Sequence, residues 1–215
     1  MSGIYVSGGP ESLIVPMYEQ GYGVDPGLVD PDFAQALLRE LKAHDKYCEG
    51  GAREGREPGV KHDSEIVKRL GSMPLLAEYR NSLNQAITEA SGFEHEHLTY
   101  LTVRVCPVGA MSSRIHRNDT WAGPWLVTLT AEGSGSINVY DDSVLEDGEE
   151  ISLTGTDTDP TPLASSTMEA GGAWGAYSGE WTAPHAGGLN TSVDPKVLVL
   201  LYGWGARSAY PFSQT

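Results

Sequence analysis

The spacing of the apolar residues changes at Gly92, and this change constrains the fold more than any other feature of the sequence. Before Gly92, apolar side chains recur every three or four residues, which predicts amphipathic helices over residues 31–44, 63–70 and 74–90. After Gly92, β-branched and aromatic residues alternate with polar ones, as they do in half-buried strands. The chain therefore begins with helices and ends with strands.

The strands of the second half are short, and glycine-rich turns separate them. We predict a hairpin across residues 133–135, and a long acidic loop over 141–167 with one short strand at 150–153. Residues 1–28 are rich in Gly and Pro and are predicted to form an extended edge segment with loops. The other predicted strands are 98–106, 125–130, 136–140, 172–177 and 197–202.

A length of 215 residues fits one domain with a sizeable core. We predict a single domain over residues 1–215, in which 1–92 are mainly helical support and 93–215 form the β core. Many short strands after a helical half indicate an α+β fold. The prediction is a jelly roll, the double-stranded β-helix of cupin-like proteins, buttressed by N-terminal helices.

The formal net charge of −15 argues against two classes of partner, nucleic acids and anionic membranes. Nucleic-acid-binding surfaces and proteins that bind anionic membranes are normally basic, so neither partner is expected. An acidic protein favours neutral or cationic small molecules through long-range attraction. Only two cysteines are present, and the N-terminus has no basic segment followed by an apolar run, so we expect a cytoplasmic protein without a signal peptide. The oligomeric state stays open.

Two histidines next to predicted strands are the candidate chemistry of the chain. His116 precedes Asn118 and Asp119, and His185 precedes a glycine-rich turn, about seventy residues later. A non-haem iron(II) site needs two imidazoles and one carboxylate on one face of the metal, with open positions on the other. Lys196, at the start of an apolar strand, is placed to meet an anionic cosubstrate.

The segment from His185 to Lys196 resembles the distal motif of the phytanoyl-CoA-hydroxylase-like group of Fe(II)/2-oxoglutarate oxygenases. That motif has the pattern His-Gly-x-x-x-Asn-x-Ser followed by a basic residue, and Asn190 and Ser192 are similar to its polar positions. The approach from Arg104 to His116 is similar to the first half of the site. The resemblance covers roughly residues 98–204 and implies Fe(II) and 2-oxoglutarate as cofactors, with O2 and a small molecule as substrates.

The sequence departs from the family pattern at the third metal ligand. The family has His-x-Asp, whereas here Asn118 stands in place of the acid and Asp119 follows one residue later. A β-bulge would bring Asp119 to the metal. Alternatively Asn118 faces it, or no protein group does, in which case the resemblance implies a halogenase with chloride in that position.

The second departure is Lys196 where the family usually has Arg. Lysine offers a point charge in place of a planar fork, and it still pairs with the far carboxylate of 2-oxoglutarate. Arg207 is the alternative cation for that role. The resemblance also implies that Asn190 and Ser192 lie near the cosubstrate, and Arg104 and Thr128 lie on strands that would face it.

These residues favour an oxygenase that hydroxylates a C–H bond of a small molecule or natural-product intermediate. 2-Oxoglutarate would be decarboxylated to succinate in the same reaction, with His116, His185 and Asp119 as metal ligands. One alternative is a halogenase or another non-hydroxylating oxidase of the same class. The other is a jelly-roll binding module without catalytic metal, in which the two histidines are incidental.

Overall fold

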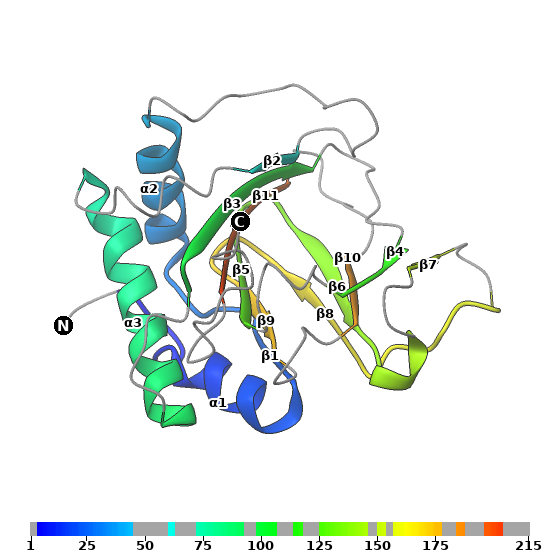
Figure 1. Ribbon diagram of the computed structural model, residues 1–215. Coiled ribbons are helices and arrows are strands. Elements are labelled where there is room, and N and C mark those ends of the chain that lie inside the picture. The colour runs from blue at the N-terminus through cyan, green and yellow to red at the C-terminus, as the bar shows by residue number, and fades with distance from the viewer. Residues whose placement is uncertain are drawn as a thin grey trace, which may run out of the picture.

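Two antiparallel sheets face one another in the computed structural model, and three α-helices lie on the other side of the larger sheet (Figure 1). The structure describes residues 4–44, 60–62, 72–92, 98–106, 114–117, 125–145, 150–153, 157–177, 184–187 and 196–203. The helices are α1 (Glu11–Gln20), α2 (Pro31–Lys42), α3 (Pro74–Ser91) and the short 3-10 helix η3 (Asp142–Val144). The strands are β1 (Tyr22–Asp25), β2 (Val60–His62), β3 (Tyr100–Cys106), β4 (Arg114–Ile115), β5 (Trp125–Glu132), β6 (Gly135–Val139), β7 (Ile151–Ser152), β8 (Ala164–Met168), β9 (Ala173–Ala176), β10 (His185–Gly187) and β11 (Lys196–Gly203).

The larger sheet has the strand order β1-β9-β5-β11-β3-β2, and the smaller one has the order β10-β6-β8. A third, two-stranded ribbon pairs β4 with β7. All of these pairs are antiparallel. Two strands of the larger sheet, β1 and β2, come from the first 92 residues, which also contain the helices α1, α2 and α3. No described helix is both long and apolar enough to cross a membrane.

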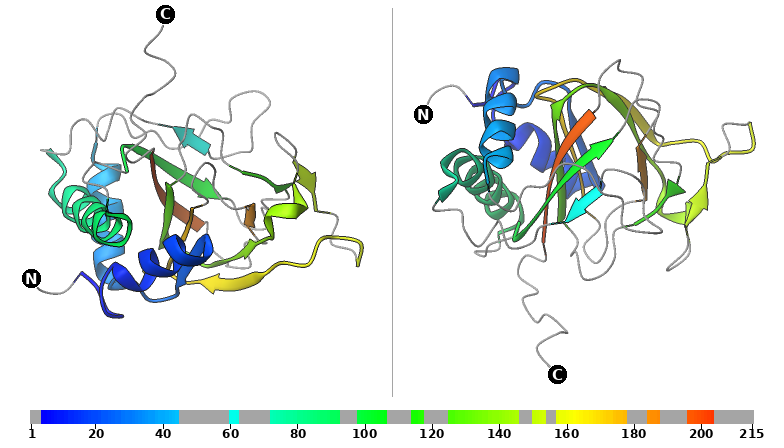
Figure 2. Two further views of the ribbon diagram at one scale, coloured as in Figure 1. Left: turned by 60° about the horizontal axis from the view of Figure 1, so that its bottom comes forward. Right: turned by 90° about the horizontal axis from the view of Figure 1, so that it is seen from above.

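The side chains of the larger sheet alternate between two cores. Val127, Leu129, Val199 and Leu201 point to the outer face and share one hydrophobic cluster with the three helices. Leu126, Trp174 and Tyr202 point to the inner face and pack against Ile137 and Val139 of the smaller sheet. Figure 2 shows α2 and α3 side by side on the face of the larger sheet away from β6, β8 and β10. Alternation along the strands therefore separates a structural core from an interior between the sheets.

The predicted helices at 31–44 and 74–90 are confirmed, and local signals explain their ends. Asp30 caps α2 by accepting a hydrogen bond of 2.7 Å from the amide of Asp32, and Pro31 occupies the first turn. The carboxylate of Glu40, on α2, accepts from the first amides of α3 at 3.1 and 2.9 Å. Gly92 ends α3 with a φ of +73°. The predicted helix at 63–70 lies outside the described residues.

The prediction of an extended edge segment with loops over residues 1–28 is confirmed at β1, which lies at the edge of the larger sheet, but it is wrong for residues 11–20, which form α1. Leu13, Ile14 and Met17 have helical spacing and are fully buried. Their burial outweighs the local cost of Pro16 within the helix. Gly21, with a φ of +88°, then ends the helix in the left-handed region.

The predicted strands of the larger sheet are confirmed, but the hairpin across residues 133–135 is wrong. The two neighbours of β5 are β9 and β11, so both of its edges are already paired. The chain turns at Gly133 (φ +75°) and enters the smaller sheet as β6. The predicted acidic loop also contains more structure than expected, since η3 and β8 lie within it alongside the expected short strand, β7.

Candidate active site

The two predicted histidines meet between β4 and β10. His116 directly follows β4 and His185 begins β10, and their backbones exchange two hydrogen bonds of 3.1 and 3.0 Å. The centres of their rings are 4.6 Å apart, and the ring planes are inclined by 55°. His185 is 4% exposed and its ring centre lies 5.0 Å from that of Trp174. The fold thus brings together two imidazoles that are remote in the sequence.

The geometry of this pair fits two ligands of one metal ion. Imidazole nitrogens about 2.1 Å from a first-row metal, at roughly a right angle to one another, place the ring centres about 4–5 Å apart. Nδ1 of His116 lies 3.1 Å from the carbonyl oxygen of Arg114. If Nδ1 carries the proton and donates to that oxygen, Nε2 has its lone pair available, which is the usual arrangement of a metal-binding histidine.

The third ligand of such a site is not among the described residues. Within the part of the chain that the structure describes, no group of three His, Cys, Asp or Glu side chains is placed to hold a metal. Asp119 and Asn118, the sequence candidates, lie outside that part. Asn190, Ser192 and Arg207, three of the predicted cosubstrate residues, also lie outside it.

A row of polar side chains crosses the inner face of the larger sheet. Thr128 of β5 and Thr102 of β3 flank Leu200 of β11, and one register step further Thr130 and Arg104 flank Leu198. The three threonines are at most 2% exposed, and Arg104 is half-buried. This row lies between the two sheets, on the same face as the apolar cluster of Leu126, Trp174 and Tyr202.

Lys196 is buried inside the same space. It is 6% exposed, which is rare for a lysine, because burial of an ammonium group is costly unless it is compensated. Its side chain passes over Gly135 at the start of β6, and a Cβ on Gly135 would collide with Nζ and lie 2.9 Å from Cδ. The lysine therefore points into the interior, and the missing side chain of Gly135 leaves room for it.

Two polar atoms of the inner row have no hydrogen-bond partner among the residues that the structure describes. The hydroxyl of Thr128 and Nε of Arg104 are buried and form no hydrogen bond with the described residues. By contrast, Oγ1 of Thr102 lies 3.1 Å from the hydroxyl of Tyr202. A buried polar atom without a partner costs about 1–3 kcal/mol, so native proteins rarely retain one without a ligand or water to satisfy it. Both predicted residues, Thr128 and Arg104, can thus form a further hydrogen bond with a polar ligand.

Replacing Thr128 with valine is expected to stabilise the ligand-free protein. Valine has nearly the same shape and removes an unsatisfied hydroxyl, so the free energy of unfolding rises by roughly 1 kcal/mol and Tm by about 2–4 °C. Thr102→Val is the matched control on the same face. It leaves the Tyr202 hydroxyl without that partner and should lower Tm. Calorimetry of both variants checks this, and a fall in Tm for Thr128→Val would mean that its hydroxyl is already satisfied.

The structure adds residues that the sequence prediction missed. Thr130 stands two positions after Thr128 and faces the same way. The alternation of side chains along a strand at 125–132 would therefore have predicted that the two threonines share a face. Gly135 was predicted only as a turn residue. Trp174 contacts His185, whereas Trp125 belongs to the outer core. The roles of Gly135 and Trp174 depend on non-local contacts that one sequence does not show.

No protein-family model and no curated protein matches the sequence. Solved structures do resemble it. The non-heme alpha ketoglutarate dependent carbocyclase SnoK from nogalamycin biosynthesis is 14% identical, with a TM-score of 0.59 over 96% of this chain and 93% of SnoK. EvdO2 from Micromonospora carbonacea var. aurantiaca, complexed with 2-oxoglutarate, is 16% identical, with a TM-score of 0.56 over 97% and 95%.

A third similar structure is the epimerase SnoN in complex with Fe3+, alpha ketoglutarate and nogalamycin RO. It is 17% identical, with a TM-score of 0.51 over 91% of this chain and 83% of SnoN. At such identities the likeness establishes the fold. The chain has the cupin-like jelly-roll fold of non-heme iron and 2-oxoglutarate-dependent enzymes, as the sequence predicted.

Proposed function

We propose that this protein is an Fe(II)/2-oxoglutarate-dependent oxygenase that hydroxylates a C–H bond of a small molecule. The observation that supports this most is the contact between His116 and His185, whose rings are 4.6 Å apart at the edge of a jelly-roll interior. The similar solved structures, two of which contain 2-oxoglutarate, share this fold. Within the superfamily, the segment from His185 to Lys196 favours the phytanoyl-CoA-hydroxylase-like group.

In this proposal, His116, His185 and Asp119 hold the iron, with Asn118 as the alternative to Asp119. When bound, the iron supplies the oxidation of 2-oxoglutarate to succinate and carbon dioxide by O2, and the coupled oxidation of the substrate. The two imidazoles must be neutral to coordinate it. For His116 the carbonyl of Arg114 selects the tautomer and orients the ring.

The cosubstrate is a dianion, and the interior offers it the groups it needs. The ammonium of Lys196 would pair with its far carboxylate, and the hydroxyl of Thr128 would donate a hydrogen bond. Arg104, Asn190 and Ser192 are proposed to lie around the same ligand, with Arg207 as the alternative cation. Because Lys196 is only 6% exposed, water screens its charge poorly, and this strengthens the attraction.

The test is formation of the ternary complex, followed by turnover of the cosubstrate. Under anaerobic conditions, Fe(II) and 2-oxoglutarate together are expected to give a weak visible charge-transfer band that neither gives alone. Admission of O2 should bleach the band and release succinate. A protein that gives neither band nor succinate, while it remains folded, would contradict the proposal and favour a binding module without catalytic metal.

A further inference from the structure

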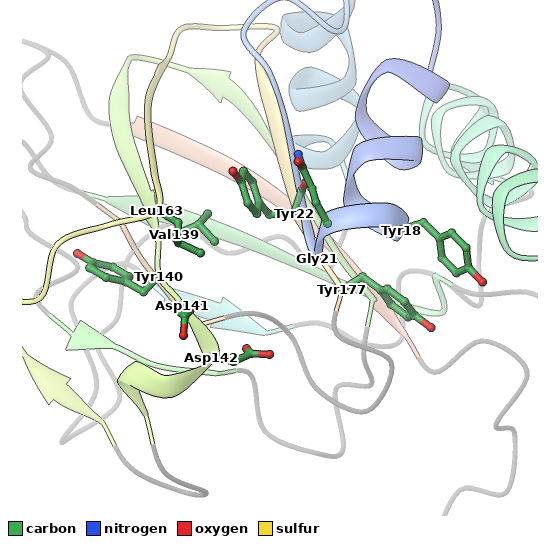
Figure 3. Close-up of a pocket in the computed structure, with 10 residues that line it drawn as sticks. Tyr18, Gly21, Tyr22, Val139, Tyr140, Asp141, Asp142, Leu163 and Tyr177 are labelled. Atoms are coloured by element: carbon green, nitrogen blue, oxygen red, sulfur yellow. The ribbon is translucent and has the colours of Figure 1, made fainter.

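A groove opens where the edge of the larger sheet at β1 and β9 faces the smaller sheet at β6 and β8 (Figure 3). Its volume of about 430 Å³ is that of a small-molecule site. Val139, which lines it, is the register partner of His185. The groove therefore ends one strand away from the histidine pair. The lining residues are Tyr18, Gln20, Gly21, Tyr22, Val139, Tyr140, Asp141, Asp142, Leu163 and Tyr177.

One wall of the groove is aromatic. Tyr18 of α1 and Tyr177, which follows β9, have ring centres 5.6 Å apart and ring planes inclined by 28°. Trp125 also stacks on Tyr177, with ring centres 4.0 Å apart, and its ring centre lies 6.3 Å from that of Tyr18, so the three rings form one cluster that orients Tyr177. Tyr22 contributes a further ring, which is half-buried against the inner core. Such rings attract cations and flat apolar groups to their faces.

The opposite wall is acidic. Asp142 is paired with Arg117 at 2.9 Å, but Asp141 forms no ion pair with the described residues. Hydrogen bonds from the hydroxyl and the amide of Ser143 lower the pKa of Asp141, so its carboxylate is ionised at neutral pH. None of the ten lining residues is Lys, Arg or His. The groove thus offers a negative charge that no described residue neutralises, across from aromatic rings.

We propose that this groove binds an organic cation, namely a ring-bearing small molecule with a protonated amino group. The ring packs against Tyr177 and Tyr18, and the ammonium group lies near Asp141. An anion would face the acidic wall and a net charge of −15, and a neutral ring would gain only the aromatic contacts. The inference rests on the proposed function in one respect, which is that the bound cation is the substrate oxidised at the histidine pair.

Three probes with the same phenol ring separate charge from shape: tyramine is a cation, 2-(4-hydroxyphenyl)ethanol is neutral, and 4-hydroxyphenylacetate is an anion. Ligand-observed NMR gives their dissociation constants without iron or 2-oxoglutarate, so the result does not depend on the oxygenase reaction. Tyramine is expected to bind about tenfold more tightly than the neutral probe, and the anion more weakly than both. Equal affinities for all three would overturn the proposal.

Asp141→Asn tests the acidic wall. Asparagine is an equally good cap for Ser143, so the local fold is retained while the charge is lost. The preference for tyramine should fall to within about twofold, and the affinity for the neutral probe should not change. Asp157→Asn, an exposed residue outside the groove, is the matched control and should leave the preference intact. An unchanged preference in Asp141→Asn would overturn the assignment of the cation to this wall.

Discussion

Replacement of His185 by alanine is expected to lower the affinity of the protein for Fe(II) by at least about a hundredfold, and to abolish the visible band with 2-oxoglutarate. Mutation of a group that only orients a metal ligand lowers metal affinity about 10–100-fold. His185→Ala removes the ligand itself, so the loss should be larger. Anaerobic titration of iron into the variant, monitored by calorimetry and by the visible band, measures the change.

Two further variants make the result specific. His116→Ala should have the same effect, and because His116 is half-buried rather than buried, its loss should disturb packing less. His44→Ala, beyond the end of α2, is the control and should bind iron like the natural protein. If the His185 and His116 variants keep full iron affinity while folded, the ring contact is a packing feature and the iron site lies elsewhere or does not exist.

The large sheet was predictable from the sequence because its strands have strong local patterns. In 125–130 and 197–202 almost every residue is apolar or Thr, and such runs have few alternatives to a buried strand. The partners of β6 were not predictable in the same way. A glycine turn between two strands is compatible with a hairpin and with a crossover, and only the competition of β9 and β11 for the edges of β5 decides.

The errors at α1 and β8 have a common physical cause. Gly and Pro around residues 8–26 indicated loops, yet the buried spacing of Leu13, Ile14 and Met17 determines a helix. In β8, a run of Ser and Thr had no apolar alternation to mark it, although its inward side chains end in the buried Met168. In both segments, tertiary contacts outweigh local signals: burial against the core in α1, and pairing with β6 in β8.

The site was predictable to the extent that it depends on chemistry at strand ends. The two histidines and Lys196 could be predicted because histidine binds metal ions, lysine pairs with anions, and few residues of these types lie next to predicted strands. Gly135 was not predicted as a site residue, because it matters only through its lack of a side chain, which leaves room for Lys196. The third metal ligand remains a prediction, because Asp119 and Asn118 lie outside the described residues.

Gly135→Ala is expected to weaken binding of 2-oxoglutarate about ten- to hundredfold while iron binding without the cosubstrate stays unchanged. Gly135 does not have a positive φ, so its backbone accepts alanine, but the new Cβ would occupy the position of the Lys196 side chain. The lysine must then move, and a charge-assisted contact of about 1.5–3 kcal/mol is lost. Anaerobic titration of 2-oxoglutarate into the iron-loaded variant measures the change.

A double-mutant cycle shows whether this effect acts through the lysine. Lys196→Met alone should also weaken 2-oxoglutarate binding, because it removes the buried cation and keeps much of the stem. In the Lys196→Met background, Gly135→Ala should have little further effect on cosubstrate affinity, since the contact is already lost. Gly27→Ala, where a Cβ meets no atom within 4 Å, is the matched control and should bind normally. Additive losses in the double variant would mean that Gly135 affects the cosubstrate by a route other than Lys196, and no loss in either single variant would remove the lysine from the anion site.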